Sequence, residues 1–443
     1  MSTTERFAHT MSLLDHPSDP MVMNFEVGLT AAFRDKKLGP ADFRRATLRA
    51  IERHEKLRFA LRVEPAAFRA SFAAAERADE LNERAWSQDG LSADDFRRQS
   101  IPFDQAPLYR FRFDPRGLTF QVACHHSLMD GFGCYELAVE IFRELVPIEE
   151  PKALTWPIPK IGLGARLYAG WVGFADELKK GAEIGKHPTT LLGPAAPVER
   201  QRHFFARADV PLAAIKETAR ESGVKATVND VILAAYHLTL EEFAGLRQTP
   251  DRLSVLVPMN MRVRYASNPR FVNRMGYVSV STLPAHRRTP ADALARVNAE
   301  MNRAKRFGKE AMVEKIMGVY EALGLMRVAR KQWLEKRLPT RYYQADKFFW
   351  KNFDTATATN MGRIFVPEEY RPLVSYMVAY APVMTPSIGL AVLGDHDRVT
   401  FGLRFGASVL SEEQGQELLS AFCRRLGSPR LEKQPLALPP KAA

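Results

Sequence analysis

The chain has 443 residues, of which 46% are hydrophobic and 10% aromatic, so it can bury more than one hydrophobic core. Its formal net charge of +12 and pI near 9.6 favour a polyanionic partner. It lacks a membrane-length apolar run and a signal peptide, which predicts a cytoplasmic protein. It also lacks HExxH and CxxC ligand patterns, which predicts no metal, and the GxxxxGK[ST] and GxGxxG phosphate loops, which predicts no nucleotide cofactor.

The first hundred residues alternate between strand and helix patterns. Apolar residues at helical spacing follow Pro40, and strict alternation follows Leu57. An Ala- and Arg-rich stretch up to about residue 100 indicates helix and loop. The elements predicted here are a strand over 23–33, a helix over 40–57, a strand over 57–63 and a hairpin of strands over 108–113 and 117–124.

The second hairpin strand leads into a segment with two histidines. His125 and His126 end the strand, Gly131 and Gly133 break its extended pattern, and a helix is predicted over 135–145. Neighbouring strand residues point to opposite faces, so the histidines have different roles, and one could act as a general base. Asp130 could accept a hydrogen bond from His126 or pair with a distant arginine; the alternative is that all of these residues form an ordinary hairpin.

A change in composition then separates two halves of the chain. From 147 to about 198 the sequence is rich in Pro, Gly and basic residues, which predicts a long connector with a helix near 167–180. We therefore predict an N-terminal half over 1–185 and a C-terminal half over 186–443.

The C-terminal half repeats the alternation of strands and helices. Thr227 and Asp230 have the spacing of a capping box at a helix start, so we favour capping over catalysis for Asn229 and Asp230. Basic and aromatic residues mix over 322–351, which indicates either a helix at a lipid surface or, preferably, a solvated helix with buried aromatics. The other predicted elements are strands over 203–210, 253–257, 276–282, 388–393 and 399–405, helices over 211–222 and 290–307, and a last helix from 411.

The segment from His125 to Gly131 resembles the HHxxxDG signature of a large acyltransferase superfamily. That superfamily includes chloramphenicol acetyltransferase, BAHD acyltransferases, condensation domains of non-ribosomal peptide synthetases, polyketide-associated acyltransferases and wax ester synthases. Segments 226–235, 257–262 and 359–363 resemble further motifs of the wax ester synthase and alcohol acyltransferase branches, so the resemblance spans nearly the whole chain.

The resemblance implies a role for each motif residue. His126 would be the catalytic base, next to the first motif histidine His125; Asp130 would lock the loop by pairing with Arg262, and Gly131 would keep a substrate tunnel open.

Two later residues are candidates for a different role. Thr355, Thr357 and Thr359 alternate on one strand face, so Thr359 and Asn360 could stabilise an oxyanion, or could form a threonine ladder and a turn.

The implied fold is α/β, with two chloramphenicol acetyltransferase-like halves of mixed sheets and flanking helices that form a pseudo-dimer around a tunnel. The implied reaction moves an acyl group from acyl-CoA or an acyl carrier protein to an acceptor hydroxyl. No cofactor would be bound; CoA or the phosphopantetheine of the carrier would be a co-substrate, and the positive charge fits the phosphates of CoA or an acidic carrier.

Two other functions remain open. One is an amide-forming, condensation-type enzyme that acts on an amine acceptor and carrier-tethered substrates, and the other is a non-catalytic protein that binds a carrier or a lipid. Peripheral membrane contact is an alternative use of the positive charge, whereas no nucleic-acid-binding motif occurs. Two departures from the family are Leu191 to Pro194 in place of the PLN motif of wax ester synthases, and the absence of the DFGWG motif of BAHD enzymes.

Overall fold

The computed structural model describes most of the chain, in segments. They are residues 21–64, 69–72, 75–87, 90–147, 202–245, 250–260, 271–273, 275–307, 354–363, 368–383, 388–407, 409–427 and 431. The predicted connector helix, the basic and aromatic segment 322–351 and the C-terminal tail beyond 431 lie outside these residues.

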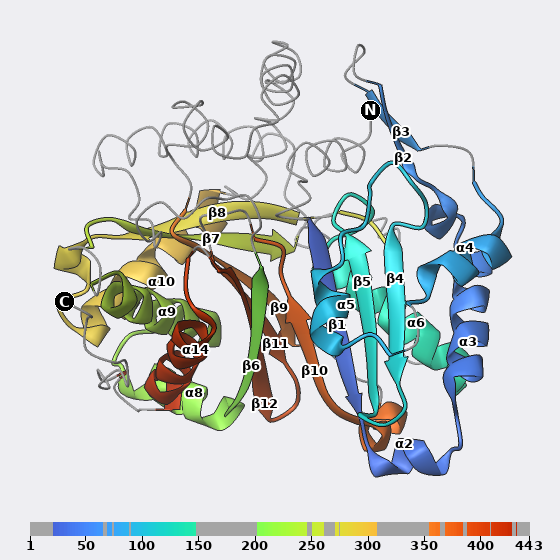
Figure 1. Cartoon of the computed structure of the whole chain (residues 1–443). Helices are drawn as coiled ribbons and strands as arrows, with labels where there is room; N and C mark the ends of the chain where they lie inside the picture. Colours follow the sequence, from blue (N-terminus) through green and yellow to red (C-terminus); the bar gives the residue numbers. More distant parts are fainter. Residues whose placement is uncertain are drawn as a thin grey trace. The chain divides into compact units, whose positions relative to one another are not determined.

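The chain divides into two compact units (Figure 1). Unit 1 comprises Met1–Pro159, Arg262–Arg274 and Ile364–Pro382; unit 2 comprises Lys160–Met261, Met275–Arg363 and Val383–Ala443. Each unit has its own sheet and flanking helices, so the predicted α/β fold class is confirmed. The predicted boundary near 185 lies outside the described residues, and unit 1 receives two segments from the second half of the sequence.

The main sheet of unit 1 has four strands, in the order β10-β1-β5-β4. Each strand runs antiparallel to its neighbours, and β4 and β5 form the predicted hairpin. Strand β10, which the sequence patterns did not predict, joins this sheet from more than 200 residues downstream. The bounds are β1 Val22–Leu29, β4 Tyr109–Asp114, β5 Thr119–His125 and β10 Val374–Tyr380.

The strand predictions before residue 75 were partly wrong. The strand expected over 23–33 ends at Leu29, because Thr30 begins helix α2 (Ala31–Asp35). The strand expected over 57–63 begins only at Leu61, as β2, because Leu57 belongs to a 3₁₀ turn, η1 (Glu55–Arg58), in which the Leu57 N–H donates to the His54 carbonyl at 2.9 Å. A local hydrogen bond therefore outweighs the alternating pattern. The other elements of this region are α3 Pro40–Arg53, β2 Leu61–Glu64, β3 Arg69–Phe72, α4 Ala78–Ala85 and α5 Ala93–Arg98.

Helices α3 and α6 (Gly131–Leu145) pack on one face of this sheet through aromatic rings. The Phe43 ring of α3 lies 4.8 Å from that of Phe120 on β5, and Phe142 of α6 meets Phe43 edge-on at 6.4 Å. All three side chains are buried, so the hydrophobic effect and ring packing hold β5 against α6.

The opposite face of the sheet carries a buried carboxylate, Glu26 of β1. Glu26 forms an ion pair with Arg97 of α5, and it accepts hydrogen bonds from the Gln121 amide and the Tyr376 hydroxyl, both at 2.6 Å. Burial acts to raise the pKa of Glu26, but Arg97 and the hydrogen bonds outweigh it and hold that pKa below its usual value. The charge of Glu26 thus ties β10, β5 and α5 to the central strand.

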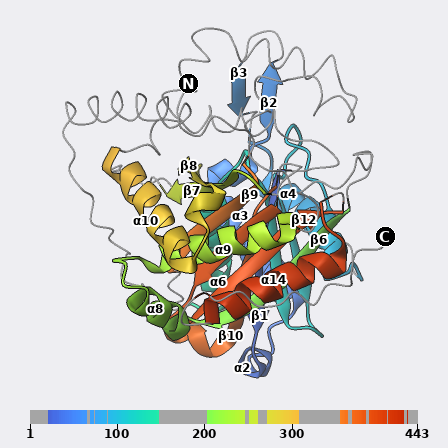
Figure 2. The same cartoon turned by 90° about the vertical axis from the view of Figure 1, so that its left-hand side faces the viewer.

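Unit 2 contains a six-stranded mixed sheet, in the order β6-β12-β11-β9-β7-β8. Strand β9 runs parallel to β11 and β7, and the remaining pairs are antiparallel. Helices α8, α9, α10 and α14 lie together on one face of this sheet (Figure 2). The strand bounds are β6 His203–Pro211, β7 Leu253–Asn260, β8 Met275–Thr282, β9 Ala356–Arg363, β11 Ile388–Gly394 and β12 Arg398–Gly406.

Most predicted elements of unit 2 are confirmed. Thr227 and Asp230 form the expected capping box, in which Oδ2 of Asp230 accepts the Thr227 N–H at 2.8 Å and Oγ1 of Thr227 accepts the Asp230 N–H at 3.3 Å. Gly223 ends the preceding helix with a φ of +68°. None of the helices in the described segments is long and apolar enough to cross a membrane. The helix bounds are α8 Leu212–Glu221, α9 Val228–Gly245, α10 Pro290–Phe307 and α14 Glu412–Gly427.

We predict that Gly28→Ala destabilises unit 1. A Cβ atom at position 28 of β1 would overlap the Tyr376 ring of β10, so the ring would have to move away from its bond to Glu26. We expect the free energy of unfolding to fall by about 1–3 kcal/mol in urea denaturation. Gly39→Ala is the control, because a Cβ at Gly39 would meet nothing within 4 Å. Equal losses in the two variants would contradict the prediction.

Candidate active site

The two motif histidines lie where strand β5 meets helix α6, as the sequence indicated. Asp130 is the N-cap of α6, and its Oδ1 accepts the Gly133 N–H at 2.9 Å. This cap starts the helix at Gly131, four residues before the predicted start at 135. Gly133 has no room for a side chain, because a Cβ there would lie 2.8 Å from Cβ of Met129. The loop that carries His126 is therefore held at the end where it enters α6.

His125 is tied into its own loop. Its ring is fully buried, and Nδ1 accepts the Ser127 N–H at 3.1 Å and lies 2.7 Å from the Ser127 hydroxyl. A ring occupied in this way shapes the loop.

His126 is held from two sides. Its backbone N–H donates to the carbonyl of Met21, next to β1, at 2.7 Å. Its ring Nδ1 lies 3.0 Å from Oδ1 of Asn273. Burial lowers the pKa of His126, and this effect outweighs the opposing influence of a hydrogen bond to its own backbone, of the Asp130 charge and of the hydrogen bond to Asn273. The imidazole is therefore neutral near pH 7. A neutral, fixed imidazole can accept a proton.

Asp130 and Gly131 lie beside this histidine in the loop. Asp130 is 4% exposed, its N–H donates to the Val272 carbonyl at 3.4 Å, and its charge acts to raise the pKa of His126. Arg262 lies outside the described residues, so its pairing with Asp130 stays a prediction. Gly131 is the half-buried first residue of α6.

A three-residue segment, Phe271 to Asn273, lies against this loop and was not found from the sequence. The Lys56 ammonium joins the two, because it donates to the Leu128 carbonyl at 2.7 Å and to the Phe271 carbonyl. The Phe271 ring meets the His54 ring edge-on at 4.7 Å. Asn273 is distant in sequence from the motif and matches no local pattern, so only the folded chain reveals it.

The two predicted oxyanion candidates, Thr359 and Asn360, belong to β9 of unit 2. The Asn360 amide is already used: Nδ2 donates to Oδ1 of Asn229 at 2.8 Å, and Oδ1 accepts the Gly362 N–H at 2.7 Å. The amide therefore closes a turn and joins β9 to the first turn of α9. The hydroxyl of Thr359 is half-buried and has no hydrogen-bond partner within the described segments.

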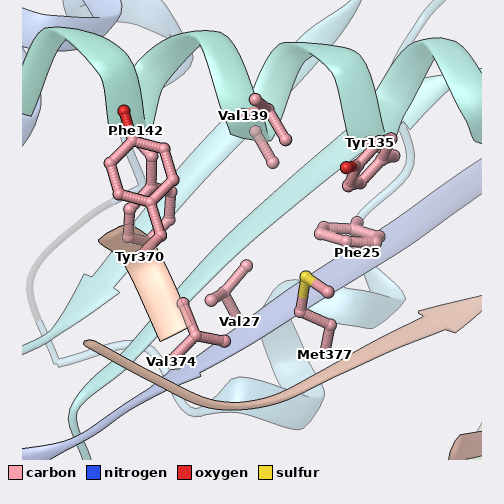
Figure 3. Close-up of a pocket in the computed structure, with 9 residues that line it drawn as sticks. Phe25, Val27, Tyr135, Val139, Phe142, Tyr370, Val374 and Met377 are labelled. Carbon is pink, nitrogen blue, oxygen red and sulfur yellow. The ribbon is translucent and has the colours of Figure 1, made fainter. Parts of the chain in front are cut away.

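Unit 1 also contains a small apolar pocket under α6 (Figure 3). Its volume is about 20 Å³, and it lies between Tyr135 and Phe142 of the helix and Phe25 and Met377 of the strands. The lining exposes no polar surface, so the pocket would not hold an ordered water. None of its lining residues lies in the motif loop. The pocket is therefore separate from the candidate site.

In the part of the chain that the structure describes, no cluster of His, Cys, Asp or Glu side chains could hold a metal ion. The cysteines Cys124, Cys134 and Cys423 are free thiols.

No protein-family model and no curated protein matches the sequence. In contrast, several solved structures share the fold. The first condensation domain of the calcium-dependent antibiotic synthetase, in complex with a substrate analogue, aligns with a TM-score of 0.62 and 14% identity over 98% of this chain and 96% of that one.

Two further condensation domains are similar. The starter condensation domain of rhizomide synthetase, a variant in complex with C8-CoA and Leu-SNAC, gives a TM-score of 0.58 at 13% identity over 96% of this chain and 92% of that one. The condensation domain of the Monacolin K polyketide synthase MokA gives 0.58 at 14% over 96% of both chains. The chain therefore has the condensation-domain fold, with two chloramphenicol acetyltransferase-like halves.

We predict that Lys56→Met weakens unit 1. The variant leaves the Leu128 and Phe271 carbonyls without their shared donor, so the free energy of unfolding should fall by about 1–3 kcal/mol in urea. Lys36→Met, at an exposed position after α2, is the control and should change stability by less than about 0.5 kcal/mol. A Lys56→Met protein as stable as the control would show that the hydrogen bonds from Lys56 to the two carbonyls do not stabilise unit 1.

Proposed function

We propose that the protein is an acyltransferase that moves an acyl group from a thioester donor to an acceptor hydroxyl, with His126 as the general base. The observation that carries this proposal is the buried, neutral His126 in a loop fixed by β1, α6 and Asn273. The likeness to condensation domains supports it, because two of those structures hold an acyl-CoA or a substrate analogue.

The proposed reaction requires one base and no covalent intermediate. His126 takes the proton of the acceptor hydroxyl while the oxygen bonds to the thioester carbonyl carbon. The tetrahedral oxyanion then collapses, the C–S bond breaks, and the imidazolium returns its proton to the leaving thiolate. The motif fits this sequence of steps because one imidazole can accept and then donate the same proton. The role of Thr359 toward the oxyanion stays a prediction.

A hydroxyl is the first acceptor we propose, because an alcohol becomes a good nucleophile only when a base takes its proton. An amine is the second candidate, and one observation favours it: the similar structures are condensation domains, and one was solved with Leu-SNAC. Both acceptors would use His126.

For the donor we propose acyl-CoA or an acyl carrier protein. The net charge of +12 would attract the phosphates of either donor.

We predict that His126→Ala abolishes transfer. With acetyl-, octanoyl- or palmitoyl-CoA and a panel of alcohols and amines, loss of the base should lower kcat/KM by about 10²–10⁴-fold, measured as free-thiol release. His396→Ala, in the β11–β12 turn, is the matched control and should keep wild-type activity. Equal background rates in all three proteins, with CoA and with carrier-loaded donors, would favour a non-catalytic binding protein.

The pH dependence of the wild type is a separate prediction. A base must be unprotonated, so kcat/KM should rise with pH through the pKa of His126 and then level off. Because burial lowers that pKa, the rise should be centred below 6.5, the usual histidine value. Initial rates between about pH 5 and 8 measure it. A midpoint above 6.5 would contradict the assignment.

A further inference from the structure

Asn273 reaches the motif loop from an excursion of the chain. Strand β7 ends at Asn260 and β8 begins at Met275, both in unit 2, whereas residues 262–274 between them belong to unit 1. Asn273 is fully buried there, so water does not replace its hydrogen bonds.

The orientation of the Asn273 amide is determined by its neighbours. Its Nδ2 donates to the carbonyl of His126 at 2.8 Å and to that of Ser127 at 3.3 Å. Carbonyl oxygens only accept, so the amide nitrogen must face them and Oδ1 must face His126. Because Oδ1 cannot donate either, the hydrogen in the 3.0 Å contact belongs to Nδ1 of His126.

His125 shows that this tautomer is not a general property of the loop. Its Nδ1 accepts the Ser127 N–H at 3.1 Å, so in the neutral ring the proton must be on Nε2. Adjacent histidines are thus held in opposite tautomers. Ser127 takes part in both, through its N–H toward His125 and its carbonyl toward Asn273.

We propose that Asn273 is a positioning residue that holds the proton of neutral His126 on Nδ1 and so leaves the Nε2 lone pair to act as the base. This inference rests on the proposed function of His126. Nε2 has no hydrogen-bond partner among the described residues, and His126 as a whole residue is 6% exposed, so this nitrogen is left for an acceptor.

The position of Asn273 depends in turn on its own segment. Phe271 adopts a φ of +53°, which is unfavourable for a bulky residue. The packing of its ring on His54 and the hydrogen bond from Lys56 to its carbonyl hold it in place. These contacts therefore hold the segment beside the motif loop.

The test is the tautomer of His126, read by NMR in full-length protein with ¹⁵N-labelled histidines. His126→Ala assigns the signals by their disappearance. In the wild type we expect Nδ1 protonated and Nε2 unprotonated at neutral pH. In Asn273→Ala we expect this preference to be lost and kcat to fall by about 100-fold, while KM changes little.

Asn273→Asp provides a second variant of nearly the same shape. The oxygen that replaces Nδ2 would face the carbonyls of His126 and Ser127, so the Asp carboxyl must carry a proton toward them. The other oxygen still accepts from Nδ1, so the tautomer should persist. Asn302→Ala, at an exposed position of α10, is the control and should match the wild type.

The outcomes separate the two proposals. An unchanged His126 tautomer in folded Asn273→Ala, or an Nε2-protonated His126 in the wild type, would overturn the inference about Asn273. Full activity of His126→Ala would overturn the proposed function, whatever the tautomer. Loss of the His126 tautomer preference in Asn273→Ala, together with a lowered kcat, would support both the role of Asn273 and the proposed function.

Discussion

The candidate site depends on the contact between His126 and the segment from Phe271 to Asn273. A histidine at a strand end is free to rotate about its side-chain bonds, and it becomes a defined base only when its ring is oriented. Here the backbone of His126 is fixed by the hydrogen bond from its N–H to the Met21 carbonyl, and the ring is fixed by Asn273. Both groups come from other parts of the chain, so an isolated strand–loop–helix unit could not form this geometry.

Unit 1 explains why the loop is rigid. β1 lies between β5 and β10, and the buried Glu26 joins all three strands through Gln121 and Tyr376. On the other face the aromatic core presses α6 onto β5. The loop between β5 and α6 thus spans two elements that cannot move apart without exposing apolar rings or an ionised carboxylate. The contacts that stabilise unit 1 therefore also hold the loop that orients His126.

Local patterns were sufficient for the elements that depend on local physics. The β4–β5 hairpin and the Thr227–Asp230 capping box followed from the alternation of the strands and the spacing of the capping residues. Two of the failures, β10 and Asn273, have a common cause. β10 and Asn273 act in unit 1 only after the chain returns to it, and no periodicity encodes such a return.

The candidate residues show the same division. His125, His126, Asp130 and Gly131 are neighbours in sequence and lie between the end of β5 and the start of α6, whereas their catalytic roles stay predictions. For Asn360, sequence could not show that its amide is occupied by Asn229, which lies 131 positions away. Long-range hydrogen bonds decide which polar groups remain free for chemistry, and they become visible only in the folded chain.

The central claim is that His126 transfers a proton and never carries the acyl group. Initial rates measured over a matrix of donor and acceptor concentrations test it most directly. Direct transfer within a complex of both substrates predicts double-reciprocal lines that intersect. Parallel lines would mean that the first product leaves before the acceptor reacts, so an acylated protein would form and the account would be wrong.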